Sequence, residues 1–270
     1  MHFKEYLLIA LESALLAGEA IMDVYRKPVY EKEFKEDNSP VTEADWAAHD
    51  VIMEKLKVSG FPVLSEEGKK IHYNERKDWE NFWLVDPLDG TKEFIKRNGD
   101  FTVNIALVNR QEAVLGVLYA PQHDLMYFSD AGSGAFRMEH FSKVWPDINS
   151  EDDLGRHAIS LPMDFGNKPF SVVASRSHRN DQTNQYIESL RKTHPDLEIV
   201  SRGSALKFCL VAEGSADIYP RFGPTWEWDT GAGQAIAEAA GCTVFLDDRD
   251  APLIYNKEDL LNPFFIVKRD

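Results

Sequence analysis

Carboxylates gather at the ends of two short apolar segments of this 270-residue chain. Asp86 and Asp89 follow the apolar residues 82–85, and the pair Glu66-Glu67 follows residues 61–64. A carboxylate directly after a buried strand lies at the edge of its sheet, where ligand sites form. Carboxylate oxygens also suit Mg²⁺, which keeps some waters and takes substrate phosphate oxygens as further ligands. The two segments therefore predict a magnesium site suited to phosphate chemistry.

The turn after residues 82–85 is expected to point its two acidic side chains at the same place. Pro87 restricts the backbone between Asp86 and Asp89, and Gly90 allows a tight turn after them. The Leu88 carbonyl lies between the acids and offers a neutral oxygen ligand. The same six residues also fit an ordinary polar turn before a helix. The turn alone leaves both interpretations open.

Two further acids lie at the starts of predicted helices. Thr42 is a good N-cap, and Asp45 is the third residue of the helix that follows. Asp229 opens a helical segment that runs to residue 240. Taken alone, Asp229 is more simply an N-cap and the Glu66-Glu67 pair a solvated loop. The combination of all these acids is what favours a metal site.

The elements that must position these acids differ between the two halves of the chain. The first half predicts an antiparallel sheet beside helices. Two of its segments have apolar residues at helical spacing, and several short apolar strands follow one another with turn residues between them. The expected helices are 3–26 and 42–57, and the expected strands are 30–35, 61–64, 82–85, 101–108, 113–119, 125–129 and 134–138. Residues 37–40 read as a turn and the acidic residues 145–156 as a loop.

The second half predicts strands that alternate with helices, which indicates an α/β arrangement. The expected strands are 170–174, 198–200, 217–219, 243–246 and 264–267, and the expected helices are 180–192, 204–213 and 229–240. We therefore expect an α/β fold with an α+β domain at 1–164, an α/β domain at 165–270, and the site between them.

Composition excludes several classes of protein. The formal net charge is −15 and no dense run of Lys and Arg occurs, which disfavours nucleic-acid binding. No apolar run reaches the roughly 18 residues that a membrane span needs, and the N-terminus does not resemble a secretion signal. The two cysteines, Cys209 and Cys242, are expected to be buried free thiols, as in a reducing cytoplasm.

The acidic motifs resemble those of the inositol monophosphatase superfamily over nearly the whole chain. Residues 83–94, Trp-Leu-Val-Asp-Pro-Leu-Asp-Gly-Thr-Lys-Glu-Phe, resemble its first signature, and residues 228–233, Trp-Asp-Thr-Gly-Ala-Gly, its second. Residues 64–67 are similar to its acidic pair and residues 40–45 to its upstream aspartate motif. One departure is Gly231, where alanine is more usual; we expect it to loosen that helix start slightly. The resemblance implies a layered αβαβα sandwich of the sugar-phosphatase type.

Within the superfamily the chain is most similar to the CysQ-type 3′(2′),5′-bisphosphate nucleotidases. The similarity lies in residues 92–94, 175–178, 203–209 and 219–225. It implies that two or three Mg²⁺ ions are held by Glu66, Asp86, the Leu88 carbonyl, Asp89 and Asp229. It further implies that Thr91 and Asp45 activate the attacking water, that Glu67 supports the metal shell, and that backbone N–H groups at Gly90 and Thr91 hold the phosphate.

The resemblance also implies a second basic subsite in the second half of the chain. Ser204, Lys207 and Arg221 are expected to bind a second phosphate and the sugar, with Ser175 and His178 near the base. Lys207 comes three residues after Ser204, so we expect both on one helical face. Lys207 and His178 are also ordinary surface residues when taken alone, whereas Arg221 suits bidentate phosphate contacts.

The implied reaction is Mg²⁺-dependent hydrolysis of 3′-phosphoadenosine 5′-phosphate to AMP and phosphate, by attack of a metal-activated water. The 5′-phosphosulfate analogue is a further candidate substrate, and lithium sensitivity and a role in sulfur assimilation accompany the resemblance. The alternatives are an inositol or other sugar phosphatase and, less favoured, a non-catalytic nucleotide sensor. Oligomeric state stays open, and so does peripheral association of a cytoplasmic protein with the inner membrane.

Overall fold

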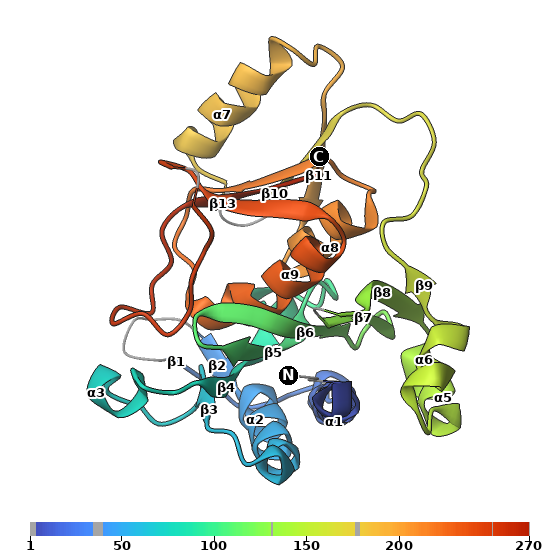
Figure 1. The fold of residues 1–270 in the computed structure, drawn as a ribbon, viewed down its shortest axis with the longest axis vertical. Helices are drawn as coiled ribbons and strands as arrows, with labels where there is room; N and C mark the ends of the chain where they lie inside the picture. The colour runs from blue at the N-terminus through green and yellow to red at the C-terminus, as the bar shows by residue number, and fades with distance from the viewer. Residues whose placement is uncertain (1–3, 35–39, 131, 176–178, 250, 270) are drawn as a thin grey trace.

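The protein folds into five layers (Figure 1). The computed structural model describes residues 4–34, 40–130, 132–175, 179–249 and 251–269. From one side to the other, the layers are a helix pair, a seven-stranded sheet, a second helix pair, a five-stranded sheet and a single helix. The helices are α1 (Lys4–Tyr25) and α2 (Glu43–Leu56), then α8 (Leu206–Glu213) and α9 (Glu227–Ala239), then α7 (Asp181–Arg191). The predicted αβαβα sandwich is confirmed.

The first half builds the seven-stranded sheet as predicted, largely as an antiparallel meander. Its strands, in spatial order, are β3 (Val63–Ser65), β4 (Asn81–Asp89), β5 (Thr102–Asn109), β6 (Glu112–Ala120), β7 (Leu125–Asp130), β8 (Gly134–Glu139) and β9 (Ile159–Ser160). Among the described strands of this sheet, only β3 and β4 pair in parallel. The carboxyl ends of these two strands therefore lie at the same edge of the sheet. A small ribbon, β1 (Lys32–Phe34) with β2 (Pro40–Thr42), leads into α2.

The second half builds the five-stranded sheet. Its strands, in spatial order, are β11 (Glu198–Arg202), β10 (Ser171–Ser175), β12 (Ile218–Arg221), β14 (Phe265–Arg269) and β13 (Cys242–Leu246). β10 runs parallel to both its neighbours, and β14 is antiparallel to both of its own. The short helices are α3 (Tyr73–Arg76), α4 (Thr91–Ile95), α5 (Phe141–Val144) and α6 (Glu151–His157), with 3₁₀ turns at Lys57–Ser59 and Trp145–Asp147.

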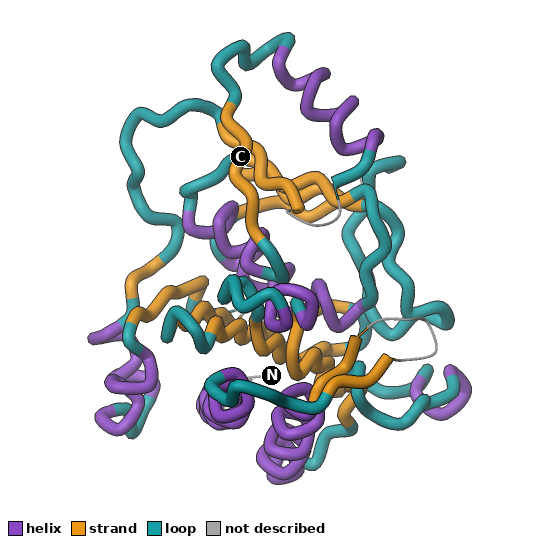
Figure 2. Tube along the Cα trace, turned by 180° about the vertical axis from the view of Figure 1, so that it is seen from behind, coloured by secondary structure: helices purple, strands orange, loops and turns teal. Residues whose placement is uncertain are grey.

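Helix α9 lies against the first sheet although it belongs to the second half, as the view from behind also shows (Figure 2). Small residues allow this close approach. A Cβ added to Gly116 of β6 would lie 2.4 Å from the Ala232 carbonyl oxygen, and one on Gly231 would lie 2.9 Å from Leu84 Cδ2. Gly231, which the sequence flagged as a weak point of this helix, therefore serves its packing on β4.

Three local predictions were wrong. Residues 145–156 are not a loop, because Ser150 caps α6 by accepting a hydrogen bond from the Asp153 N–H at 3.4 Å. Helix α8 begins at Leu206 instead of residue 204. β4 continues past residue 85 to Asp89, with an irregular register between Asp86 and Asp89. The predicted turn at 37–40 falls largely outside the described residues.

The division of the chain at residues 164 and 165 stays a proposal. The chain crosses from one sheet to the other between Ser160 and Ser171. One hydrophobic cluster contains residues of both halves, including Leu118, Phe208 and Ile236. Within the described part of the chain, no helix is long and apolar enough to cross a membrane.

Candidate active site

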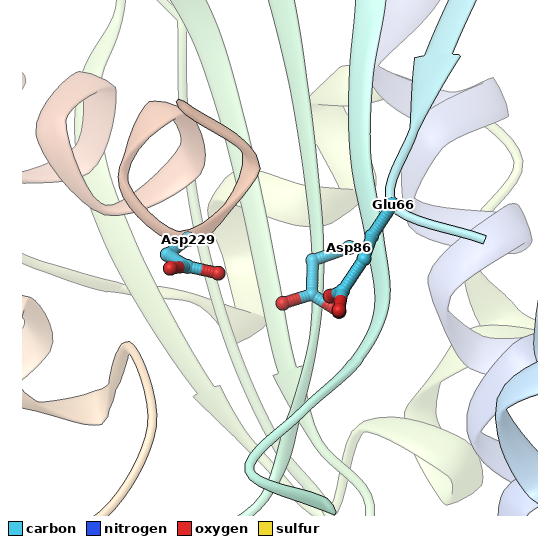
Figure 3. A group of neighbouring side chains, drawn as sticks. All are labelled: Glu66, Asp86 and Asp229. Atoms are coloured by element: carbon cyan, nitrogen blue, oxygen red, sulfur yellow. The ribbon is translucent and has the colours of Figure 1, made fainter. Parts of the chain in front are cut away.

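Three carboxylates from distant parts of the chain meet at one point (Figure 3). Glu66, Asp86 and Asp229 each offer one oxygen, and these oxygens all lie within 4.8 Å of one another. Glu66 follows β3, Asp86 lies in β4 and Asp229 lies in the first turn of α9. The parallel pairing of β3 and β4 places the first two side by side, and Asp229 faces them from the helix.

Local hydrogen bonds hold each of these acids in place. The Glu66 N–H donates to the Val85 carbonyl at 3.1 Å, which ties the end of β3 to β4. Asp86 Oδ1 accepts from the Leu88 N–H at 3.0 Å. Asp229 Oδ2 accepts from the N–H of Trp226, the N-cap of α9, at 2.8 Å. Helix α9 therefore begins two residues before the predicted start, and Asp229 occupies its third position.

Burial and mutual repulsion make this a site for positive charge. Burial raises the pKa of Asp86 well above its usual value, and the charges of Glu66, Asp89, Asp229 and Glu67 raise it further. Burial likewise raises the pKa of Asp229, helped by Asp89 and Glu66. A divalent cation bound by these oxygens would relieve the repulsion. The residues present therefore fit Mg²⁺.

Asp89 lies between this cluster and a lysine. Burial raises the pKa of Asp89 to about 6, against the opposing effects of Lys207 and of hydrogen bonds from the Ala205 N–H and Asn104. Asn104 of β5 donates from Nδ2 to Asp89 Oδ2 at 3.4 Å. Glu67 is buried, and its charge raises the pKa of Asp86.

The structure brings Asp45 and Thr91 together, as predicted. Thr91 Oγ1 lies 3.2 Å from Asp45 Oδ1 and 3.4 Å from the Leu88 carbonyl oxygen, so its one proton can be donated to either acceptor. Asp45 Oδ2 accepts from both the N–H and the hydroxyl of Thr42 at 2.7 Å. This capping box fixes the carboxylate, while Gly90, with φ of 94°, begins the helix at Thr91.

A cavity of about 330 Å³ connects the acids with the predicted substrate residues. The residues predicted for the metal and phosphate sites that line it are Glu66, Asp89, Gly90, Thr91 and Asp229. The residues predicted for the nucleotide site that line it are Ser175, Ser204, Lys207 and Arg221. His178 lies outside the described residues. The cavity therefore holds carboxylates and cationic groups together.

Lys92, Lys207 and Arg221 are the cationic side chains among the described residues that line the cavity, and the last two differ in their surroundings. Lys207 is buried and donates to the Ser204 carbonyl, and burial lowers its pKa to about 8 while Asp89 opposes the shift. Arg221 donates from Nη2 to the Pro224 carbonyl at 2.8 Å. Its Nε is buried without a hydrogen-bond partner among the described residues, as expected of a group that awaits an anion.

One geometric argument for this subsite was wrong. Ser204 and Lys207 do not share a helical face, because Ser204 precedes α8 and has a left-handed backbone with φ of 48°. Both residues still line the cavity. The irregular segment 203–205, and not helical spacing, brings them there.

Several polar residues of the site were missed. Asn104 bonds Asp89, and Asp100 bonds the backbone of Gly203. Further polar residues line the cavity, namely Lys92, Glu93, Tyr219 and Thr225. Glu93 belongs to residues 92–94, which carried part of the resemblance. For Asp100 the only local signal is the polar turn 98–100 before a strand, and such turns are common.

Comparisons with known proteins agree with this geometry. A model of the inositol monophosphatase family matches residues 3–263. The 3′(2′),5′-bisphosphate nucleotidase CysQ of Salmonella typhimurium is 48% identical over 256 residues, which cover 93% of this chain and 94% of the relative.

Solved structures show the same fold. The crystal structure of CysQ from Bacteroides thetaiotaomicron has a TM-score of 0.92 at 48% identity, with 99% of this chain and 98% of that chain covered. The inositol monophosphatase of Anabaena has a TM-score of 0.71 at 26% identity, with 99% and 92% covered.

Proposed function

Since this chain belongs to the inositol monophosphatase family, we propose that it is a Mg²⁺-dependent 3′(2′),5′-bisphosphate nucleotidase that converts 3′-phosphoadenosine 5′-phosphate to AMP and phosphate. It is a phosphatase. The relative from Salmonella typhimurium and the solved structure from Bacteroides thetaiotaomicron, each 48% identical to this chain, are both CysQ proteins. The 5′-phosphosulfate analogue is a second candidate substrate. The two cysteines are buried and unpaired, which suits a reducing cytoplasm.

The observation that carries this proposal is that one cavity holds both carboxylates and cationic side chains. Asp89 and Asp229 line it together with Lys207 and Arg221. An inositol monophosphate has no second phosphate for Lys207 or for the buried Arg221 Nε, which has no hydrogen-bond partner among the described residues, and buried donors without partners are costly. A nucleotide with two phosphates would engage the metal carboxylates with one phosphate and these cations with the other.

We propose that Glu66, Asp86, the Leu88 carbonyl, Asp89 and Asp229 hold two or three Mg²⁺ ions. When bound, Mg²⁺ supplies positive charge that stabilises the phosphate oxygens and the leaving oxygen. Glu67, which is buried and acts on Asp86 through its charge, supports the orientation of these ligands.

The residues of the chain then orient the attacking water. Thr91 donates its proton to Asp45 Oδ1, which turns the Thr91 oxygen lone pairs toward the cavity to accept a proton from water. Backbone N–H groups at Gly90 and Thr91 face the phosphate that is cleaved. The new bond forms between the water oxygen and phosphorus while the ester bond breaks. The proton that the water loses passes through Thr91 to Asp45, and the leaving oxygen takes up a proton from solvent water.

We further propose that Ser204, Lys207 and Arg221 bind the second phosphate and the sugar, and that Ser175 and His178 lie near the base. Arg221 supports this assignment most directly, because its buried Nε has no partner within the described residues. Sensitivity to lithium, typical of the family, is expected to follow from the same metal site.

The test is phosphate release from four substrates, each with and without Mg²⁺. The substrates are 3′-phosphoadenosine 5′-phosphate, 3′-AMP, inositol 1-phosphate and fructose 1,6-bisphosphate. We expect the nucleotide bisphosphate to have the highest kcat/KM by about 10²–10⁴-fold, the worth of two charged hydrogen bonds. Equal or better turnover of inositol 1-phosphate would reject the nucleotidase in favour of a sugar phosphatase, and binding without turnover would favour a sensor.

A further inference from the structure

Asp100 does not line the cavity, but it contacts two backbone segments that do, one at Gly90 and one at Gly203. This residue lies between α4 and β5 and is only 1% exposed. Its Oδ2 accepts from the Gly203 N–H at 3.1 Å, and its Oδ1 accepts from Arg202 Nη1 at 3.2 Å. These bonds connect a loop of the first half to segment 202–205, which leads into α8 in the second half.

Two glycines bring both walls of the site against Asp100. A Cβ added to Gly90 would lie 3.0 Å from the Asp100 carbonyl oxygen. A Cβ added to Gly203 would lie 2.8 Å from the same oxygen and 2.9 Å from Asp100 Cβ. Gly90 precedes Thr91 in the turn that carries the metal-site acids, and Gly203 precedes Ser204. One residue is therefore in contact with the backbone of both phosphate subsites.

This arrangement fixes the separation of the two subsites. The turn at Gly90 and the segment at Gly203 cannot move together or apart without breaking the bonds of Asp100 or losing its packing. The Ala205 N–H, which bonds Asp89, adds a second link between the same two segments. A nucleotide bisphosphate carries both phosphates on one ribose, so the distance between them has a limited range, and both subsites must lie within that range to be filled at once.

We propose that Asp100 is a positioning residue that sets the distance between the two phosphate subsites and so selects bisphosphates over monophosphates. The proposal rests on the proposed function. Asp100 acts through Gly203 and not on the substrate, since it is absent from the described residues that line the cavity. Its bond to the Gly203 N–H is the main link, because Arg202 is half exposed and an exposed ion pair contributes little.

The experiment compares Asp100→Ala and Asp100→Asn with wild type in three measurements. The first is kcat/KM for 3′-phosphoadenosine 5′-phosphate, which needs both subsites. The second is kcat/KM for 3′-AMP, which needs only the metal side. The third is equilibrium binding of AMP without Mg²⁺, which reports the cationic side alone. Circular dichroism confirms that each variant is folded.

We expect Asp100→Ala to lower kcat/KM for the bisphosphate about 10- to 100-fold, the worth of one charged hydrogen bond. Turnover of 3′-AMP and binding of AMP should change less than about threefold, because each subsite alone stays intact. Asp100→Asn keeps an acceptor for Gly203 and should lose less than Asp100→Ala. This order keeps the test decisive even if the alanine variant is unstable.

Asp217 provides the matched control. Its carboxylate also accepts from a backbone N–H and a cation, those of Ser171 and Lys168, at 2.7 and 2.6 Å. It lies before β12, at the end of the sheet away from Ser175 and Arg221, roughly 13 Å along the strand at about 3.3 Å per residue. Asp217→Asn is expected to leave the preference for bisphosphate unchanged.

Each result separates this inference from the proposed function. If wild type prefers the bisphosphate but Asp100→Ala lowers all three measurements equally, Asp100 is structural and its positioning role is wrong. The same holds if Asp217→Asn reduces the preference as much as Asp100→Ala does. If wild type itself shows no preference, the proposed function fails, and the selection assigned to Asp100 fails with it.

Discussion

Asp89 differs from Asp86 and Asp229 because the Lys207 charge is the largest effect that opposes its rise in pKa. Burial raises its pKa to about 6, whereas Lys207 and the Ala205 N–H favour the charged form. The neutral isostere Asn keeps the shape of the side chain and removes its charge. Asp89 therefore offers the cleanest single test of the metal site.

We expect Asp89→Asn to lower kcat by more than about 100-fold, because metal charge stabilises the transition state by several kcal/mol. The unfolding temperature should stay near that of wild type, since the substitution relieves charge repulsion at a cavity wall. Phosphate release and a thermal melt measure the two effects. A rate close to wild type would show that Asp89 is not a metal ligand.

The Asp45–Thr91 pair is expected to act as one unit. Thr91→Ala and Asp45→Ala should each reduce kcat strongly and leave KM largely unchanged, and the double variant should be little worse than either. Thr91→Ser keeps the hydroxyl and should retain most of the activity. Fully multiplicative losses would instead indicate that the two residues work independently. Asp45→Ala also removes a helix cap, at a cost of about 1 kcal/mol in stability.

At the scale of elements, the position of Asp229 depends on how closely α9 packs on the first sheet. No local hydrogen bond reaches from Asp229 to Asp86, so the contact of the helix with β4 and β6 decides their separation. Gly116 is a close point of that contact, at 2.4 Å between an added Cβ and a backbone oxygen of the helix. A backbone atom cannot rotate away as a side chain can.

Gly116→Ala should therefore destabilise the protein by about 1–3 kcal/mol, the usual cost of overpacking, and lower turnover by shifting Asp229. Urea unfolding and phosphate release measure both. Gly155→Ala is the matched control, because an added Cβ in α6 meets no atom within 4 Å. It should be neutral or stabilise by about 0.5–1 kcal/mol, as alanine does in a helix. Equal losses in both variants would contradict the close-packing argument.

At the scale of the whole molecule, the proposed metal site joins the two halves. Glu66 and Asp86 come from the first half and Asp229 from the second, and their charges repel one another in the folded state. The unfolded chain separates these acids, so it neither suffers this repulsion nor forms the metal site.

Mg²⁺ should therefore raise the unfolding temperature in a concentration-dependent way. Binding to the folded state alone stabilises it by about 2.7 kcal/mol at one hundred times Kd. Thermal melts with MgCl₂ are compared with KCl at equal ionic strength, in wild type and in Asp86→Asn. The same increase with both salts would point to charge screening across a protein of net charge −15. Asp86→Asn should lose most of the Mg²⁺-specific increase.

The sequence by itself determined the main helices and strands and named most residues of the candidate site, the elements through local signals and the site largely through a family resemblance. Helical period predicted α1, alternation predicted the antiparallel meander, and Thr42 with Asp45 predicted the cap of α2. The turn around Asp86 and Asp89 and the pairing of Asp45 with Thr91 were also predicted, the latter through a family resemblance. Hydrogen bonds over a few residues and side-chain periods are readable without the fold.

Only the tertiary structure decided what meets across the cavity. The close packing of α9 sets Asp229 against Glu66 and Asp86, and Asp100 reaches Gly203 from far along the chain. Ser204 reaches the cavity through a left-handed residue and not through helical spacing. Such contacts depend on the volume of side chains between layers and on the path of irregular segments. Neither leaves a periodic trace in the sequence, so packing alone could reveal them.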